Sequence, residues 1–278
     1  MLFFIQFLAM GLGVGVLGTL VGAGGGFILT PLLLLIFTDQ PSEVIAATSL
    51  SVVCLNALSG SVAYYRQKRI DIKTSVSFAL AGSVGAIIGV FATSEVARGP
   101  FDFLLGMALL ILCISIINPP PPFEATRESP GGIGALAHRR IVDSHGKVYE
   151  YAFRFRLGAA LSSIVGFLAT FLGIGGGPMH VPLMIRILRI PPHIATATSQ
   201  CELLFTTALA VAFHFILGNL HAMKSVILPL AIGIIVGAQA GAAISHRVKS
   251  LTLTRILAVL MTLVSLQLLY KGASEWFW

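Results

Sequence analysis

The feature that most constrains this chain is a glycine-rich interruption that occurs twice within apolar sequence. Residues 22–26 read GAGGG and residues 173–177 read GIGGG, and in each copy a proline follows five residues after the last glycine. The triplet Ala-Thr-Ser recurs as well, at 47–49 and 197–199. Backbone that unwinds inside a membrane survives only where it is buried in protein or lines a wet cavity. Paired interruptions in two halves of a chain therefore indicate a binding site at the interface between two repeats, as in transporters.

The composition predicts an all-α polytopic membrane protein. Of 278 residues, 56% are hydrophobic and only 10% are charged, against about 25% charged in soluble domains. The 18 Lys and Arg exceed the 11 Asp and Glu, which is typical of the cytoplasmic loops of membrane proteins. We therefore expect a lipid bilayer rather than nucleic acid as the surroundings of this chain.

Apolar segments alternate with short polar ones along nearly the whole chain. Their approximate ranges are 3–21, 27–38, 44–65, 74–94, 101–118, 157–172, 178–190, 194–217, 224–244 and 252–270. Six of them, outside the glycine-broken regions, approach the roughly 20 residues needed to cross a bilayer. Small residues spaced four apart, at Gly85 and Gly89 and at Gly233, Gly237 and Gly241, predict close helix packing.

Two topologies compete for the glycine-broken regions, and the positive charges discriminate between them. If each region crosses once, eight crossings form parallel repeats and the Lys and Arg residues divide 12 to 6. If each region folds back as a re-entrant hairpin, six full crossings remain and the division is 15 to 3, which obeys the positive-inside rule better. The sequence thus favours two inverted repeats, each a re-entrant hairpin followed by three transmembrane helices.

The re-entrant topology divides the chain into a first repeat (1–118), a linker (119–155) and a second repeat (156–278). It places both termini in the periplasm and the linker in the cytoplasm of a cell with an inner (plasma) membrane. The linker opens with four prolines, and its Ile141-Val142 and Val148-Tyr149 segments flank Asp-Ser-His-Gly, which predicts a β-hairpin.

The glycine breaks are the first candidate site. A helix that begins just after a break directs its free N–H groups and positive dipole end at the membrane centre, where they attract anions. Glycine permits left-handed backbone and close approach of a ligand, which we expect at Gly25 and Gly176 in particular. The candidate substrate-binding residues in the breaks are Gly22, Gly24, Gly25, Gly26, Gly173, Gly175, Gly176 and Gly177. The alternative is that these glycines serve helix packing alone.

Polar residues in the segments downstream of the breaks form a second layer of candidates. Ser49 and Asn56 are seven residues apart and share a helix face, while Ser199, Glu202 and Thr206 follow an i, i+3, i+7 pattern. Single Ser and Thr residues in membrane helices usually bond only to backbone carbonyls, but matching positions in two repeats favour a shared lining. The substrate-binding candidates from this layer are Thr48, Ser49, Asn56, Thr198, Ser199, Gln200 and Thr206.

Two ionisable residues are candidates for proton coupling. Glu202 lies within an apolar segment, where burial of a charged carboxylate is costly and an ionisable group indicates function. His180 lies three residues after the second break and can titrate near neutral pH or donate to an anion. The aligned positions in the first half are Val52 and Leu29, so the site cannot be symmetric.

The segments GTLVGAGGGFILTPLLL and FLATFLGIGGGPMHVPLM, together with the two Ala-Thr-Ser triplets, resemble the sulfite exporter TauE/SafE family. The resemblance covers both halves but not the linker. It implies a bacterial or archaeal inner-membrane permease for small anions such as sulfite, sulfonates or some carboxylates. It also implies roles for the glycines of both breaks and for Thr48, Ser49, Thr198 and Ser199.

The sequence thus predicts a secondary transporter that exports a small anion, most simply sulfite or an organosulfonate such as sulfoacetate, by alternating access. The alternatives are an anion channel and a carrier of another small carboxylate or organosulfur anion. An enzyme is not expected, because the sequence offers no nucleophile–base set or metal cluster, and its three cysteines are scattered through apolar segments. We expect no cofactor, no metal and no nucleic-acid partner, and the sequence leaves the oligomeric state open.

Overall fold

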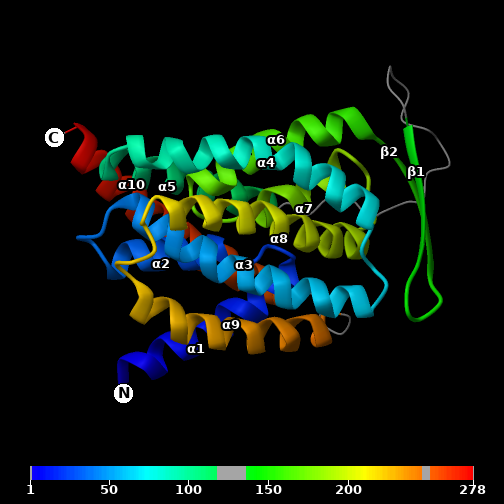
Figure 1. Ribbon diagram of the computed structural model, residues 1–278, viewed down its shortest axis with the longest axis horizontal. Helices are drawn as coiled ribbons and strands as arrows, with labels where there is room; N and C mark the ends of the chain where they lie inside the picture. Colours follow the sequence, from blue (N-terminus) through cyan, green and yellow to red (C-terminus); the bar gives the residue numbers. More distant parts are fainter. Residues whose placement is uncertain (1, 118–135, 246–250, 278) are drawn as a thin grey trace.

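The computed structural model describes residues 2–117, 136–245 and 251–277, with side-chain detail for 2–114, 136–245 and 261–276. Ten helices and one two-stranded sheet make up these residues (Figure 1). They are α1 (Leu2–Val21), α2 (Gly26–Ile36), α3 (Ser42–Arg66), α4 (Ile72–Glu95), α5 (Arg98–Ile117), β1 (Leu136–Val142), β2 (Val148–Arg154), α6 (Phe155–Phe171), α7 (Gly177–Arg186), α8 (Pro192–Ile216), α9 (Lys224–Ile244) and α10 (Leu251–Phe277). The expected all-α polytopic membrane protein is confirmed.

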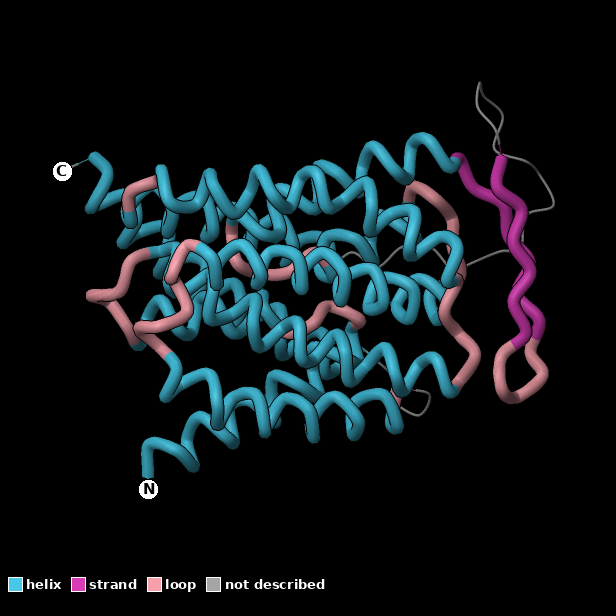
Figure 2. Tube along the Cα trace, in the orientation of Figure 1, coloured by secondary structure: helices cyan, strands magenta, loops and turns pink. Residues whose placement is uncertain are grey.

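Five helices among the described residues are long and apolar enough to cross a membrane, namely α1, α3, α4, α8 and α9. The two glycine breaks separate α1 from α2 and α6 from α7, and both α2 and α6 are too short to cross alone. Figure 2 shows loop segments in the interior of the helical body as well as at its two ends.

Each broken segment folds back on itself, so its two ends lie at the same end of the molecule. In the first half, the rings of Phe7 near the start of α1 and Phe37 just after α2 stack with centroids 6.0 Å apart. In the second half, Phe155 at the start of α6 and Leu188 just after α7 belong to one apolar cluster. Figure 1 shows that the two folded-back segments open toward opposite ends of the body.

The two halves interlock rather than pack as separate bodies. Helix α1 packs along α9, and α6 packs along α4, so each folded-back segment rests on a helix of the other half. Helices α3 and α8 form the central pair, and α5 pairs with α10 (Figure 1). The expected small-residue packing is confirmed, because a methyl group at Gly85 would overlap the carbonyl of Ser163, and one at Gly233 would overlap that of Leu8.

The linker contains the expected β-hairpin. Strands β1 and β2 pair antiparallel, from Leu136 opposite Arg154 to Val142 opposite Val148. The aromatic side chains of the hairpin, Tyr149, Tyr151 and Phe153, pack on α4, α7 and the start of α8. The residues that complete this cluster are Phe78, Met184, Leu188, Ile190 and Ile194. The hairpin therefore shares its apolar core with the helical body.

The hairpin is also held by polar contacts to the loop before α4. Asp71 caps that helix by accepting from the backbone N–H of Thr74. Its Oδ2 atom accepts from the Tyr151 hydroxyl at 2.8 Å and pairs with Arg139 Nε at 3.2 Å. One buried carboxylate thus joins both strands to the helical body.

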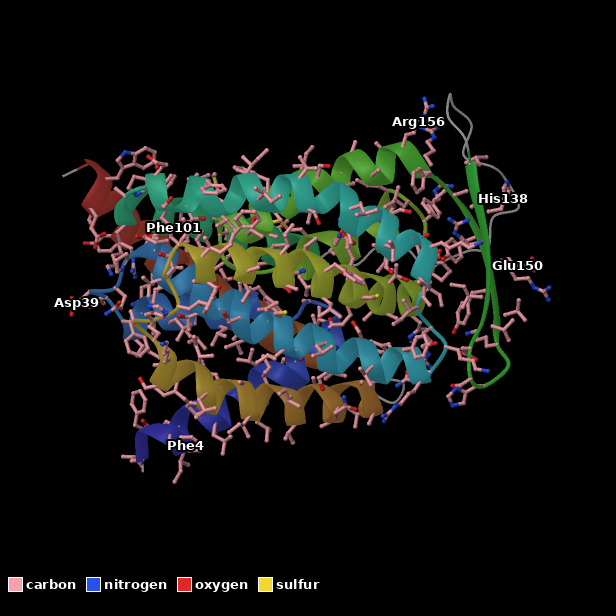
Figure 3. All side chains as sticks on the ribbon, in the orientation of Figure 1. Phe4, Asp39, Phe101, His138, Glu150 and Arg156 are labelled. Atoms are coloured by element: carbon pink, nitrogen blue, oxygen red, sulfur yellow. The ribbon has the colours of Figure 1, made fainter. Side chains whose placement is uncertain are left out.

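The hairpin and the two chain termini lie at opposite ends of the molecule. Phe4, Asp39 and Phe101 mark one end, and His138, Glu150 and Arg156 mark the other (Figure 3). The re-entrant topology requires this arrangement, whereas single crossings would put the termini and the linker at the same end.

Candidate functional site

The two glycine breaks touch each other in the middle of the helical body. A methyl group on Gly26 would overlap the carbonyl of Ile174, and one on Gly177 would overlap the backbone of Ala23. Thr30 of α2 reinforces the contact by placing its hydroxyl 2.6 Å from the carbonyl oxygen of Gly173. The sequence repeat therefore corresponds to one structural element, a junction at which α2 and α7 both begin.

The backbone conformations at this junction differ between the two halves. Gly25 has a φ of 84°, in the left-handed region where a side chain is unfavourable. Gly176, in contrast, has an ordinary helical φ of −68°, and a methyl group there would make contacts of 3.4 Å to Val165 and 3.7 Å to Ala169. The expectation that Gly176 needs glycine geometry is wrong. At the second break the positive φ values fall at Gly173 and Gly175, which match Gly22 and Gly24 of the first.

A small closed cavity lies beside the N-terminus of α7. Helices α6, α7 and α8 line it, with Val165, Gly166, Ala169, Gly176, Gly177, His180, Ser199, Glu202, Leu203 and Thr206. Its interior offers about 10 Å³ to the centre of a water molecule, which is room for about one water. All ten residues that line it are buried, so the helices must separate before a larger ligand can enter.

The cavity wall carries a buried ionisable pair. The Nδ1 atom of His180 lies 2.7 Å from Oε2 of Glu202, and both side chains are at most 4% exposed. The other ring nitrogen of His180 lies 3.0 Å from the hydroxyl of Ser162. Because the histidine and the glutamate come from different helices, α7 and α8, a relative movement of these helices would break or remake the pair.

The hairpin reaches this pair through two aromatic rings. Phe78 of α4 stacks on the His180 ring at a centroid distance of 6.0 Å. Phe153 of β2 meets the same Phe78 edge-on at 5.9 Å. The hairpin is therefore connected to the candidate site through the ring of Phe78.

Donors at the start of α7 complete the cavity. The N–H groups of Met179 and His180 bond to the carbonyl of Gly176, which leaves those of Gly176 and Gly177 outside the helical pattern. Ser199 is buried, and its hydroxyl finds no partner among the described residues. These groups line the same cavity as the His180–Glu202 pair, and a small acceptor in the cavity can accept from them.

Six of the sequence candidates thus meet at one cavity: Gly176, Gly177, His180, Ser199, Glu202 and Thr206. The other polar candidates are buried elsewhere, with bonds inside the protein. Thr48 donates to the carbonyl of Val44, Ser49 lies 2.8 Å from the Thr30 hydroxyl, and Thr198 accepts from the backbone N–H of Asp71. Asn56 accepts from Thr19, and Gln200 donates to the carbonyl of Asn56.

The first half has no equivalent of this polar cavity at the aligned positions. Leu29 and Val52, which align with His180 and Glu202, are fully buried in the largest apolar cluster. Gly22, Gly24, Gly25 and Gly26 pack against Thr196, Leu203, Val14 and Ile174 instead. The asymmetry expected from the sequence is therefore present in the packing.

Three residues at or near the breaks and the cavity were not identified from the sequence: Ser162, Thr19 and Thr170. Ser162 contacts His180 from a helix where no spacing pattern distinguishes it from an ordinary buried serine. Thr19 and Thr170 both lie three residues before the first glycine of a break, a repeat that could have been noticed. Thr170 bonds across to the carbonyl of Ala86 on α4, and Thr19 to Asn56 on α3.

Metal ligation gains no support from the described part of the chain. No group of three His, Cys, Asp or Glu residues comes together there. Cys54, Cys113 and Cys201 are free thiols on separate helices.

Comparison with known proteins identifies the family. The family profile described as "Sulfite exporter TauE/SafE" matches residues 7–268. This range includes both glycine breaks and the helices α6, α7 and α8 that line the cavity. The chain belongs to the sulfite exporter TauE/SafE family. The resemblance read from the glycine breaks is thereby confirmed, and the TauE/SafE membership establishes the protein as a membrane transporter.

Curated relatives of this TauE/SafE chain carry general names. A probable membrane transporter protein of Bacillus subtilis, YunE, is 28% identical over 97% of this chain and 98% of its own length. A probable membrane transporter protein of Methanocaldococcus jannaschii is 24% identical over 92% of this chain and 91% of its own. No solved structure matches the chain.

Proposed function

We propose that this TauE/SafE protein exports a small oxyanion, sulfite or an organosulfonate such as sulfoacetate, by alternating access. The observation that carries the proposal is the small cavity at the N-terminus of α7, which backbone donors and the buried His180–Glu202 pair line together. The family description supports sulfite, and a sulfonate presents the same three-oxygen head group.

Electrostatics favours an anion at this position. The N-terminus of a helix carries about half a positive charge and unpaired N–H donors. Ser199 adds a buried hydroxyl without a partner. A carboxylate at Glu202 would repel the same anion, so binding is favoured when the pair has taken up a proton. Proton-coupled transport follows from this arrangement, with Glu202 and His180 as the coupling residues.

The closed cavity supports a carrier rather than an anion channel. A channel needs a continuous path whose sites bind weakly enough for ions to leave. Here the space is no larger than about one water, so each transport cycle requires helices to move. Flux that saturates with substrate would agree with the carrier.

Transport assays with purified protein in liposomes test the substrate. We expect saturable flux of sulfite or sulfoacetate and weak or absent flux of taurine, whose amine cancels the charge of its sulfonate. Lactate and thiosulfate serve as a carboxylate and a second sulfur oxyanion. Equal rates for all five compounds, or flux of lactate alone, would contradict the proposed substrate class.

The membrane orientation gives a separate prediction. We propose that the hairpin end faces the cytoplasm of the inner membrane, because 15 of the 18 Lys and Arg residues lie on that side of the re-entrant topology. A single cysteine introduced at His145, in the exposed hairpin turn, should be protected from an impermeant thiol reagent in intact cells. A cysteine added after Trp278, in a background without the three native cysteines, should react. The opposite labelling pattern would reverse the orientation.

A further inference from the structure

The environment of His180 determines which ring nitrogen carries hydrogen. The Ser162 hydroxyl donates its hydrogen to the carbonyl of Gly158, 2.8 Å away on the same helix. A hydroxyl has only one hydrogen, so the same oxygen can only accept from the His180 Nε2 atom at 3.0 Å. In this arrangement Nε2 carries hydrogen and Nδ1 faces Glu202. The alternative is the opposite tautomer, in which the Ser162 hydroxyl turns to donate to Nε2 and Nδ1 carries the hydrogen.

This assignment limits the pair to one shared proton. With Nε2 protonated, either the Nδ1 atom holds the proton and Glu202 is a carboxylate, or Glu202 holds it and donates to a neutral ring. Both forms have no net charge. Uptake of one further proton from water gives a histidinium beside a neutral carboxyl, with a net charge of +1 next to the start of α7.

Two other titratable groups on the packed elements lie far from the hairpin: His214, in the last turn of α8 and 3.1 Å from the Asn219 amide, and Glu95, at the end of α4. The remaining ones lie toward the hairpin end. On α8 they are Cys201, 3.3 Å from the Ser75 hydroxyl, and the exposed His193. On α6 and α7 they are the exposed Arg156 and Arg186. At the hairpin, Asp71 bonds to Tyr151 and pairs with Arg139. Helix α4 contacts the pair through Phe78, which stacks on His180, and through Gly82. A methyl group on Gly82 would lie 3.6 Å from Oε1 of Glu202. Among the residues that line the cavity, His180 and Glu202 are the ionisable ones.

We infer that Ser162 is a positioning residue that holds His180 with Nε2 protonated, so that one proton taken up by the His180–Glu202 pair accompanies one monovalent anion. The inference rests on the proposed anion transport for its second half, whereas the histidine assignment stands apart from it. Ser162 touches no substrate; it acts through the ring.

Nitrogen-15 NMR of histidine-labelled protein in lipid bilayers tests the assignment directly. The His180 signals are identified by their loss in His180→Gln. We expect Nε2 of His180 to be protonated at every pH at which the protein is folded. A bare Nε2 with hydrogen on Nδ1 alone would overturn the assignment, whatever the protein transports.

Binding of isethionate at a series of pH values tests the role of Ser162, because this sulfonate is a monovalent anion that stays ionised throughout. Ser162→Ala removes the acceptor that stabilises the doubly protonated ring. The midpoint above which the anion is lost should therefore move to lower pH, and Ser162→Thr should restore it. Ser163→Ala is the matched control, since Ser163 bonds across to the carbonyl of Ala81 and not to the pair.

The outcomes distinguish the positioning role of Ser162 from the proposed anion transport. An unchanged midpoint in Ser162→Ala, with the protein folded, would overturn the positioning role. Absence of anion binding by the unmodified protein, with Nε2 protonated, would overturn the proposed function and the coupling while leaving the histidine assignment in place.

Discussion

Glu202→Gln should move the pH dependence of anion binding to higher pH while keeping the cavity intact. The amide retains the size and hydrogen-bonding capacity of the carboxyl but cannot become negatively charged. In the unmodified protein, binding that requires one proton weakens about tenfold per pH unit above the midpoint. In the variant the proton goes to a His180 ring that no longer shares one with a carboxylate, so the midpoint above which a monovalent sulfonate such as isethionate is lost should lie at higher pH than in the unmodified protein. The measurement is equilibrium binding across a pH series.

The matched control for this prediction is Glu150→Gln. Glu150 lies on β2, where its side chain is 68% exposed and pairs with Arg140 at the surface. Surface pairs of this kind contribute little, so this variant should keep the original pH profile. If Glu202→Gln also keeps that profile, Glu202 plays no part in coupling, and uniport driven by the membrane potential becomes the simpler account.

Gly177→Ala should abolish transport by separating the two glycine breaks. Its added methyl would overlap the backbone of Ala23, which cannot move without displacing the start of α2. Overpacking of this kind costs about 1–3 kcal/mol and sometimes more. The measurement is transport together with the yield of monodisperse protein, and we expect both to fall.

Two further alanine variants show how the loss of yield and transport depends on the space around each glycine. Gly13→Ala on α1 meets no atom within 4 Å and should leave yield and transport unchanged. Gly176→Ala adds a methyl to the cavity wall without backbone strain, so the protein should fold normally but bind anion more weakly. Equal behaviour of Gly177→Ala and Gly13→Ala would show that the breaks do not need their close contact.

The breaks in the helices and the hairpin were the parts of this fold that sequence could predict. Paired GxGGG segments fixed where the helices break, and the distribution of Lys and Arg distinguished folded-back segments from single crossings. Turn residues between β-branched and aromatic residues predicted the hairpin. These features are local or periodic, so they can be read along the chain.

The geometry of the site depended on tertiary contacts that the sequence does not encode locally. Gly25 and Gly176 occupy matching positions, yet their φ values are 84° and −68°. Ser162 gains its role from His180, eighteen residues further along the chain. The sequence also could not indicate which polar candidates would be bonded within the protein, as Thr48 and Thr198 are.

The location of the bound anion tests the central claim most directly. Selenite has the shape and charge of sulfite, and selenium can be located in a crystal by its anomalous scattering. The account predicts a single strong peak in the α6–α7–α8 cavity, within hydrogen-bond distance of the Gly177 N–H and the Ser199 hydroxyl, with His180 and Glu202 lining the same cavity. A peak in the first half beside Asn56, or at the α5–α10 contact, with none in this cavity, would contradict it.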